Sequence, residues 1–242
     1  MDTPSTAGSA SAANAADRIA GWLAQLAPPG TRTACSPILP FDAFNEEEAA
    51  AVAKAVERRR DEFLTGRALA RRALAGLGCP PSAILVGTAR LPVWPDGFLG
   101  SISHCSGMCV ALIGRRDALL GIGIDVEQAG AVTPDMLDQL CVAAERDRLF
   151  AGAPAGADVA TLAFSAKEAF YKAYFPAVRH TLEFTDVWLD VAWTEARFSL
   201  SLTSAAAPDI AGRRRLHGHF TWIGPFVVTA VWVSLLGHPA LS

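Results

Sequence analysis

The order of the expected helices and strands constrains the fold more than any other feature of this sequence. A long helical segment at 45–78 precedes apolar, β-prone runs, and the same order returns in the second half of the chain. Asn45 suits the start of that helix, because its short side chain can accept a bond from the free N–H groups of the first turn. We therefore expect an α/β (α+β) fold, a pseudodimer of two similar halves that each pack a long helix on a mostly antiparallel sheet.

Shorter elements fill in this outline. We expect a short helix at 17–27, paired strands within 99–113, a strand at 119–128, helices at 134–150 and 161–175, and four short strands within 184–236. Gly66 is expected to bend or split the long helix, since glycine is a poor helix former. The predicted organisation is a flexible tail at 1–16, an N-terminal half at 17–122 and a C-terminal half at 123–242, with the catalytic cleft between the halves.

Composition excludes several classes of protein. Of the 242 residues, 51% are hydrophobic and 19% are charged, which is typical of a globular protein. The net charge of −3 argues against nucleic acid as a partner. No apolar run reaches the roughly 20 residues of a membrane span, and the first residues lack the pattern of a secretory signal. The five cysteines form no CxxC pair, so we expect reduced thiols in a cytoplasmic protein.

The run "GIGIDVEQ" at 121–128 places two carboxylates where they can act together. In a strand, Asp125 and Glu127 point to the same face, because side chains alternate with a period of two. Two adjacent carboxylates repel each other unless a proton or cation lies between them. Mg²⁺ is commonly held by one or two carboxylates together with substrate phosphates. The pair alone favours the simpler interpretation of two solvated acids at an exposed strand end.

The run "FSAKEAFYKAYF" at 164–175 raises a similar question for a helix. Glu168 and Lys172 are four residues apart and therefore share one side of the helix. An ordinary surface ion pair between them would stabilise the helix by about 0.2–0.5 kcal/mol. Aromatic residues flank the same side, however, so the helix is expected to be buried almost all round. Glu168 would then face a cleft as a third carboxylate, and Lys172 could meet a phosphate.

Together these stretches resemble the 4′-phosphopantetheinyl transferase superfamily, in its larger Sfp/EntD-like branch. The family carries a G-[IV]-D-x-E strand and, some forty residues later, [FW]-[ST]-x-K-E-[AS]-x-x-K. Here these motifs read "GIDVE" at 123–127 and "FSAKEAFYK" at 164–172. Two further stretches, "ERRRDEFLTGRALARRAL" and "LPVWPDGFLGSISHC", resemble the basic helix and the Ser-His segment of the same branch. The motifs cover roughly residues 38–176.

The resemblance implies a reaction in which coenzyme A donates its phosphopantetheine arm to a serine of an apo carrier protein and 3′,5′-ADP is released. It implies Mg²⁺, or alternatively Mn²⁺, held by Asp125, Glu127 and Glu168. Glu168, or Glu127 through a water, would take the serine proton as general base. Lys172 would stabilise or protonate the leaving phosphate.

The resemblance also implies which residues bind coenzyme A. Arg59 and Arg67 would hold its 3′-phosphate end, although both also fit an ordinary basic helix face. Ser103 and His104 would contact a phosphate, and Lys167 and Lys172 would hold phosphate on the catalytic side. The branch often has a basic residue where this chain has Val86, and we expect Arg90 to compensate for it.

The expected partners follow from this reaction. They are acyl or peptidyl carrier proteins or domains of polyketide, nonribosomal peptide, siderophore or fatty-acid synthases, and the larger branch is expected to act as a monomer. Two alternatives stay open at the level of sequence. One is a non-catalytic module that binds coenzyme A or a carrier protein. The other is a Mg²⁺-dependent phosphohydrolase that needs no carrier.

Overall fold

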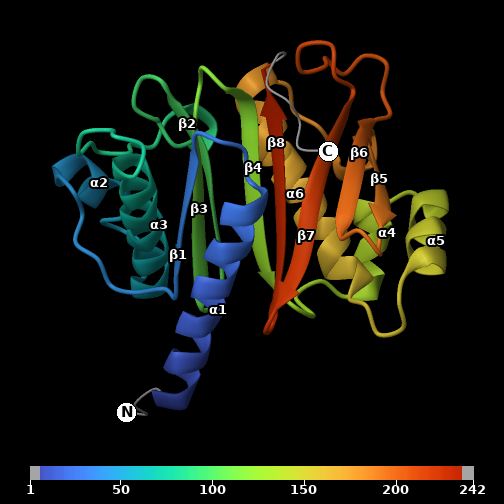
Figure 1. Cartoon of the computed structure of the whole chain (residues 1–242), viewed down its shortest axis with the longest axis horizontal. Coiled ribbons are helices and arrows are strands. Elements are labelled where there is room, and N and C mark those ends of the chain that lie inside the picture. The colour runs from blue at the N-terminus through green and yellow to red at the C-terminus, as the bar shows by residue number, and fades with distance from the viewer. Residues whose placement is uncertain (1–5, 236–242) are drawn as a thin grey trace. The chain divides into compact units, whose positions relative to one another are not determined.

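A computed structural model describes residues 6–235, and the chain divides into two α/β units (Figure 1). The first unit ends at Ala118 and the second begins at Leu119. The expected boundary lay between residues 122 and 123. The observed one falls earlier because the strand that starts at Leu119 pairs along its length with the last strand of the second unit. Each unit combines an antiparallel sheet with a long helix, which confirms the predicted fold class.

The first unit is a three-stranded antiparallel sheet with a helix packed against it. Its strands are β1 (Thr31–Ser36), β2 (Phe98–Cys105) and β3 (Met108–Arg115), in the order β1-β3-β2. Helix α3 (Glu57–Ala75) packs against the sheet, and α1 (Thr6–Leu26) packs against β1 (Figure 1). The buried side chains of this core include Leu69, Ala70, Cys109, Ala111 and Ile113.

Three features of the first unit differ from the sequence-based expectations. A helix rather than a flexible tail occupies residues 6–16, while residues 1–5 lie outside the described part. The segment 45–78 forms two helices, α2 (Glu46–Ala51) and α3, and the break falls at 52–56, not at Gly66. Strand β1 was not predicted, because its sequence "TRTACS" is short and mostly polar.

The second unit is a five-stranded antiparallel sheet. Its strands are β4 (Leu119–Gln128), β5 (Val187–Ala192), β6 (Arg197–Leu202), β7 (Arg215–Ile223) and β8 (Phe226–Ser234), in the order β4-β8-β7-β6-β5. Helix α6 (Val159–Val178) packs against β4 and β8 (Figure 1). The helix expected at 134–150 is instead a broken segment of η2 (Pro134–Met136), α4 (Leu137–Leu140) and α5 (Ala143–Gly152). Two further short turns are η1 (Thr88–Arg90) and η3 (Phe184–Asp186).

Two glycines of β4 allow the strand to lie unusually close to α6. A Cβ atom on Gly123 would overlap the backbone carbonyl oxygen of Ala169, and one on Gly121 would come within 2.6 Å of the carbonyl oxygen of Ala173. Ala169 and Ala173 are themselves fully buried. Because side chains alternate along a strand, the odd-numbered residues of β4 from Gly121 onward face this helix; the register is irregular between Leu119 and Gly121. The close approach therefore also aims Asp125 and Glu127 at the α6 side.

The close approach yields a direct test. We expect Gly123→Ala to lower the free energy of unfolding by at least about 2 kcal/mol, because overpacking a rigid backbone contact is strongly destabilising. Gly21→Ala is the matched control, since a Cβ there meets nothing within 4 Å and alanine favours the helix interior. Thermal and urea denaturation of the two variants measure the difference. Equal stabilities would contradict the close packing of β4 on α6.

Candidate active site

Strand β4 presents two carboxylates on the face turned to α6. Asp125 is opposite Thr229 of β8 and is only 2% exposed, while Glu127 is opposite Val227 and is partly exposed. The intervening Val126 is fully buried on the other face. The predicted alternation of the "GIGIDVEQ" strand is therefore observed. Both faces of the strand are covered at Asp125 and Val126. The alternative interpretation of two solvated acids at an exposed strand end therefore does not fit this strand.

Helix α6 supplies a lysine and a third carboxylate beside this strand. Asp158 caps the helix by accepting a hydrogen bond from the backbone N–H of Thr161 at 3.1 Å. One turn further, the Ser165 and Thr229 hydroxyls lie 2.8 Å apart and join α6 to β8. Lys172 donates from Nζ to Oδ1 of Asp125 at 2.6 Å. The lysine thus reaches across to β4, a contact that the helical i,i+4 spacing with Glu168 did not predict.

The electrostatics of this cluster raise the pKa values of two acids. Burial, followed by repulsion from Asp125 and Glu168, raises the pKa of Glu127 to about 7, although Lys172 acts in the opposite direction. Burial also raises the pKa of Glu168, again with Asp125 raising and Lys172 lowering it. Glu127, Glu168, Asp125 and Lys172 therefore act on one another as a single charged cluster. A carboxyl group with a pKa near 7 can exchange a proton at neutral pH.

The chemistry of these side chains fits a divalent cation, but their placement is not that of a finished metal site. Hard carboxylate oxygens that repel one another are the donors that Mg²⁺ prefers. Within residues 6–235, however, no group of three or more His, Cys, Asp or Glu side chains lies close enough to hold one ion. The expected convergence of three carboxylates is thus not observed. The ammonium group of Lys172 supplies positive charge to Asp125 instead.

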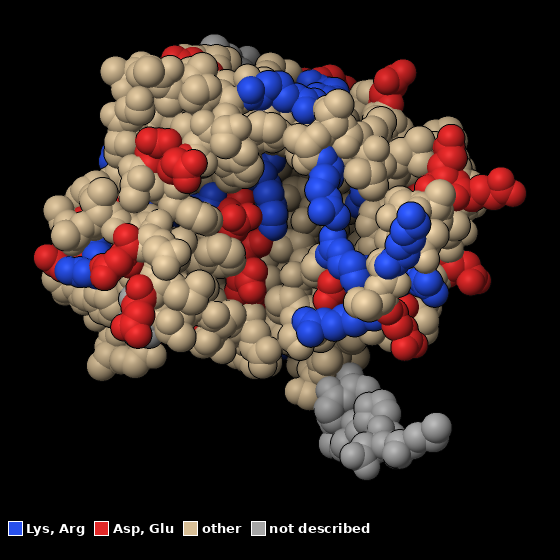
Figure 2. Space-filling view, turned by 180° about the vertical axis from the view of Figure 1, so that it is seen from behind, with Lys and Arg blue, Asp and Glu red and all other residues tan. Residues whose placement is uncertain are grey.

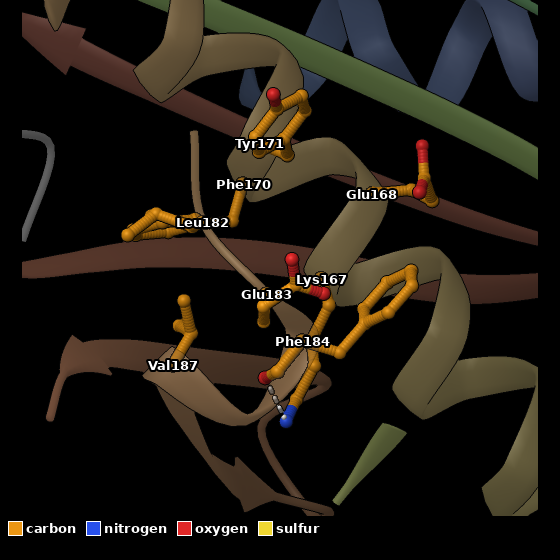
Figure 3. Close-up of a pocket in the computed structure, with 8 residues that line it drawn as sticks. All are labelled: Lys167, Glu168, Phe170, Tyr171, Leu182, Glu183, Phe184 and Val187. Atoms are coloured by element: carbon orange, nitrogen blue, oxygen red, sulfur yellow. Dashed lines mark hydrogen bonds between the residues drawn. The ribbon is translucent and has the colours of Figure 1, made fainter. Parts of the chain in front are cut away.

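A pocket of about 120 Å³ adjoins Glu168 (Figure 3). Helix α6 provides one wall, and the segment that runs through η3 into β5 provides the other. The lining side chains are Lys167, Glu168, Phe170, Tyr171, Leu182, Glu183, Phe184 and Val187. Most of this lining is apolar or aromatic, with Glu168 and Glu183 as its carboxylates. A pocket of this kind suits a narrow, mostly uncharged chain beside a charged group.

Lys167 does not occupy the position expected of a phosphate ligand. It is 2% exposed, and its Nζ pairs with Glu145 at 2.9 Å. The same nitrogen donates to the carbonyl oxygen of Phe184, away from the carboxylate of Glu168 (Figure 3). The prediction that Lys167 holds phosphate is wrong for this structure, because the amine is buried and engaged within the protein.

The first unit brings two of its predicted coenzyme A residues together. Nη1 of Arg59 on α3 lies 2.8 Å from Nε2 of His104 on β2. Glu62, one turn along α3, lies 3.4 Å from Arg59 and 3.7 Å from Nδ1 of His104. The pKa of Glu62 lies below its usual range. Burial acts to raise this pKa, but the effect is outweighed by hydrogen bonds and positive charge from Arg58, His104 and Arg59. Glu62 was not predicted, although its place three residues after Arg59 was a usable signal.

The other predicted residues of the first unit have different surroundings. Arg67 is only 6% exposed, donates from Nε to the carbonyl oxygen of Ile84 at 2.7 Å and lies over the ring of Phe63. Burial lowers the pKa of its guanidinium to about 10. Ser103 is buried in β2. Arg90 is exposed in the short turn η1, where its φ of 60° places it in the left-handed region.

Charges of both signs are interspersed on the face of the molecule in Figure 2. Within residues 6–235, no helix combines the length and the apolar character needed to cross a bilayer. All five cysteines are free thiols.

Comparison with known families decides the class of protein. The family model described as the 4′-phosphopantetheinyl transferase N-terminal domain matches residues 47–114, and that of the 4′-phosphopantetheinyl transferase superfamily matches residues 121–228. The chain belongs to the 4′-phosphopantetheinyl transferase superfamily. The predicted family and enzyme class are therefore confirmed.

Individual relatives support the same assignment. The chain is 37% identical to 4′-phosphopantetheinyl transferase PptT of Mycobacterium tuberculosis over 190 residues, which cover 76% of this chain and 84% of the relative. It is 37% identical to 4′-phosphopantetheinyl transferase Svp of Streptomyces mobaraensis over 199 residues, which cover 81% and 80%. Enterobactin synthase component D of Escherichia coli K12 is 39% identical over 120 residues, which cover 48% of this chain and 55% of the relative.

The raised pKa of Glu127 predicts how the stability of this transferase depends on pH. Its folded-state pKa of about 7 exceeds the ordinary value of 4.5, so the folded state binds more protons between these pH values. The stability due to protonated Glu127 is therefore complete below pH 4.5 and is lost as the pH rises through 7. The side chain of the Glu127→Gln variant does not titrate. In EDTA, the free energy of unfolding of this variant relative to that of the wild type should therefore rise by about 1–2 kcal/mol between pH 5 and pH 8.

Thermal denaturation at several pH values checks this expectation. Glu195→Gln, which alters an exposed carboxyl group of the same unit, is the control and should follow the wild type. A constant difference between Glu127→Gln and the wild type across this range would show that the pKa of Glu127 is not raised in the folded protein.

Proposed function

We propose that this enzyme transfers the 4′-phosphopantetheine arm of coenzyme A to a serine hydroxyl of an apo carrier protein. The serine Oγ forms a bond to the phosphorus that bears the pantetheine arm, and the P–O bond to the nucleotide breaks. The products are the holo carrier protein and 3′,5′-ADP, and the serine proton passes to a base on the enzyme. The observation that carries this proposal is the charged cluster of β4 and α6 on a chain of this family.

Within the cluster, Asp125, Glu127 and Glu168 are the residues that would hold Mg²⁺, with Mn²⁺ as the alternative. The donor set supports this assignment, because buried and half-buried carboxylates that repel one another are stabilised by a cation. A bound Mg²⁺ would neutralise diphosphate charge and stabilise the leaving phosphate. Mg²⁺ is commonly held by one or two carboxylates together with substrate phosphates, so a site of this kind does not require three converging carboxylates from the protein.

The side chains themselves would move the protons. Glu127 and Glu168 both have raised pKa values, so either can accept the serine proton near neutral pH. Lys172 holds a positive charge 2.6 Å from Asp125 and can offer a hydrogen bond to the leaving phosphate when coenzyme A is bound. The pocket beside Glu168 would take the pantetheine arm, whose alkyl and amide groups suit its largely apolar walls.

In the first unit, Arg59 and His104 are the best candidates for the 3′-phosphate of coenzyme A. A guanidinium group binds phosphate through paired N–H donors, and the imidazole beside it can add a third when it is protonated and turned to the phosphate. Glu62 would hold both side chains in place. Arg67, Arg90 and Ser103 stay predictions as further contacts to coenzyme A.

The carriers would be acyl or peptidyl carrier domains of polyketide, nonribosomal peptide, siderophore or fatty-acid synthases. A siderophore pathway is supported by the similarity to enterobactin synthase component D. We also propose that the enzyme acts as a monomer in the cytoplasm, where free cysteines such as those of this chain persist.

The reaction is tested with coenzyme A, Mg²⁺ and a panel of apo carrier proteins, with mass spectrometry of the carrier. We expect Glu168→Gln to lower kcat/KM by at least about 100-fold, because it removes a group proposed to hold the cation or accept the proton. Glu195→Gln is the control and should keep the wild-type rate. Binding of coenzyme A without transfer by the wild type would favour a binding module. Turnover of coenzyme A without a carrier would favour a phosphohydrolase.

A second variant tests the remote end of the substrate. Arg59→Ala should raise the KM for coenzyme A about tenfold or more and change kcat much less, because the 3′-phosphate is far from the reacting bond. Arg60→Ala, at the next and exposed arginine of α3, should leave both constants unchanged. Steady-state kinetics with varied coenzyme A separates the two constants. A fall in kcat alone would remove Arg59 from the phosphate site.

A further inference from the structure

Lys167 is a buried ammonium group whose hydrogen-bonding capacity is filled by the protein. Its Nζ donates to the carbonyl oxygen of Leu140 at 2.7 Å and to that of Phe184 at 3.0 Å. It also lies 2.9 Å from Oε1 of Glu145. An ammonium group has three N–H donors, so these three partners account for all of them. Lys167 therefore connects segments of the protein that are distant in sequence.

Glu145 extends this contact to a further element. It is 1% exposed, and its Oε1 accepts a hydrogen bond from the backbone N–H of Leu189 at 2.6 Å. Through the pair of Lys167 and Glu145, the end of α4, helix α5, the turn η3 and strand β5 are all joined to α6. None of these contacts is local in sequence, since the bonded residues are between 17 and 44 positions apart.

Stability alone is a weak reason for such an arrangement. Removing two charges from water is costly, and well-packed apolar residues often stabilise a fold as well as a buried ion pair does. A directed pair with several hydrogen bonds does, however, fix the relative position of the segments it joins. The segments joined here include both walls of the pocket beside Glu168, which are α6 and the segment 182–187. Phe184 accepts from Lys167 in the middle of the wall that also contains Leu182 and Val187 (Figure 3).

We propose that Lys167 and Glu145 form a positioning pair that sets the width of this pocket for the pantetheine arm of coenzyme A. This inference rests on the proposed function, since it assumes that the arm lies in the pocket. Lys167 lines the pocket, but its ammonium group is bonded within the protein, and Glu145 is not among the lining residues. The pair holds the wall formed by 182–187 against α6, directly beside Glu168, the next residue in the chain.

The test compares two ligands that differ only in the arm. Coenzyme A carries the pantetheine arm, whereas 3′,5′-ADP lacks it and does not enter the pocket. Lys167→Met removes the three donors and releases the wall, so it should weaken binding of coenzyme A about tenfold and change binding of 3′,5′-ADP less than about twofold. Isothermal titration calorimetry with the full chain measures both. Lys54→Met, at an exposed lysine, is the matched control and should bind both ligands like the wild type.

A double variant separates positioning from stability. Lys167→Met alone leaves Glu145 buried without its cation and should lower the melting temperature. Adding Glu145→Gln removes that charge and keeps an acceptor for Leu189, so much of the lost stability should return. The carbonyl groups of Leu140 and Phe184 still lack their donor, so coenzyme A binding should stay weak. If the affinity for coenzyme A recovered together with the stability, the pair would only stabilise the fold, and the proposed positioning role would be contradicted.

The outcomes distinguish this inference from the proposed function. If the wild type modifies a carrier but Lys167→Met binds both ligands as well as the wild type does, the positioning pair is refuted and the proposed function stands. Equal weakening of both ligands also refutes it, because the effect would not belong to the arm. If the wild type binds coenzyme A no better than 3′,5′-ADP, the arm does not use the pocket and the inference fails. If the wild type modifies no carrier, the proposed function fails by itself.

Discussion

The close contact between strand β4 and helix α6 is the constraint on which the site depends. Gly121 and Gly123 leave room for the carbonyl groups of α6, and small alanines face them from the helix. A larger residue at either glycine would push the helix away from the strand. Since the odd-numbered residues of β4 from Gly121 onward share one face, the same geometry turns Asp125 and Glu127 toward the helix. Packing and chemistry therefore have a common origin in this strand.

The contact also accounts for the electrostatics. Asp125, Glu127 and Glu168 are brought into a partly dehydrated region where their charges repel one another and a single lysine offsets them. Such an arrangement is unfavourable for the folded protein by itself, and the proposed binding of a cation and a diphosphate would stabilise it. Glu168 belongs to the charged cluster and also lines the pocket, and Lys167 precedes it in the chain, so helix α6 contributes to the cluster, the pocket and the buried pair.

Much of this arrangement could be predicted from the sequence, and the failures have physical reasons. Local periodicity placed Asp125 and Glu127 on one face, and the cap at Asn45 was correct. Contacts between distant segments were not accessible, so the pairing of Lys172 with Asp125 and the burial of Lys167 were missed. Strand β1 exists because β3 pairs with it, not because of its own composition. Helix propensity similarly favoured one helix over 45–78, but the helix is interrupted at 52–56.

The central claim is that the carboxylates of β4 and α6 hold a divalent cation together with the diphosphate of coenzyme A. The most direct measurement is a crystal structure of the enzyme with Mn²⁺ and coenzyme A, in which anomalous scattering locates the ion. The account predicts an anomalous peak bounded by Asp125, Glu127 or Glu168 and the diphosphate oxygens, with Lys172 turned toward phosphate. Coenzyme A bound with its diphosphate away from these carboxylates, or an ion held elsewhere, would contradict it.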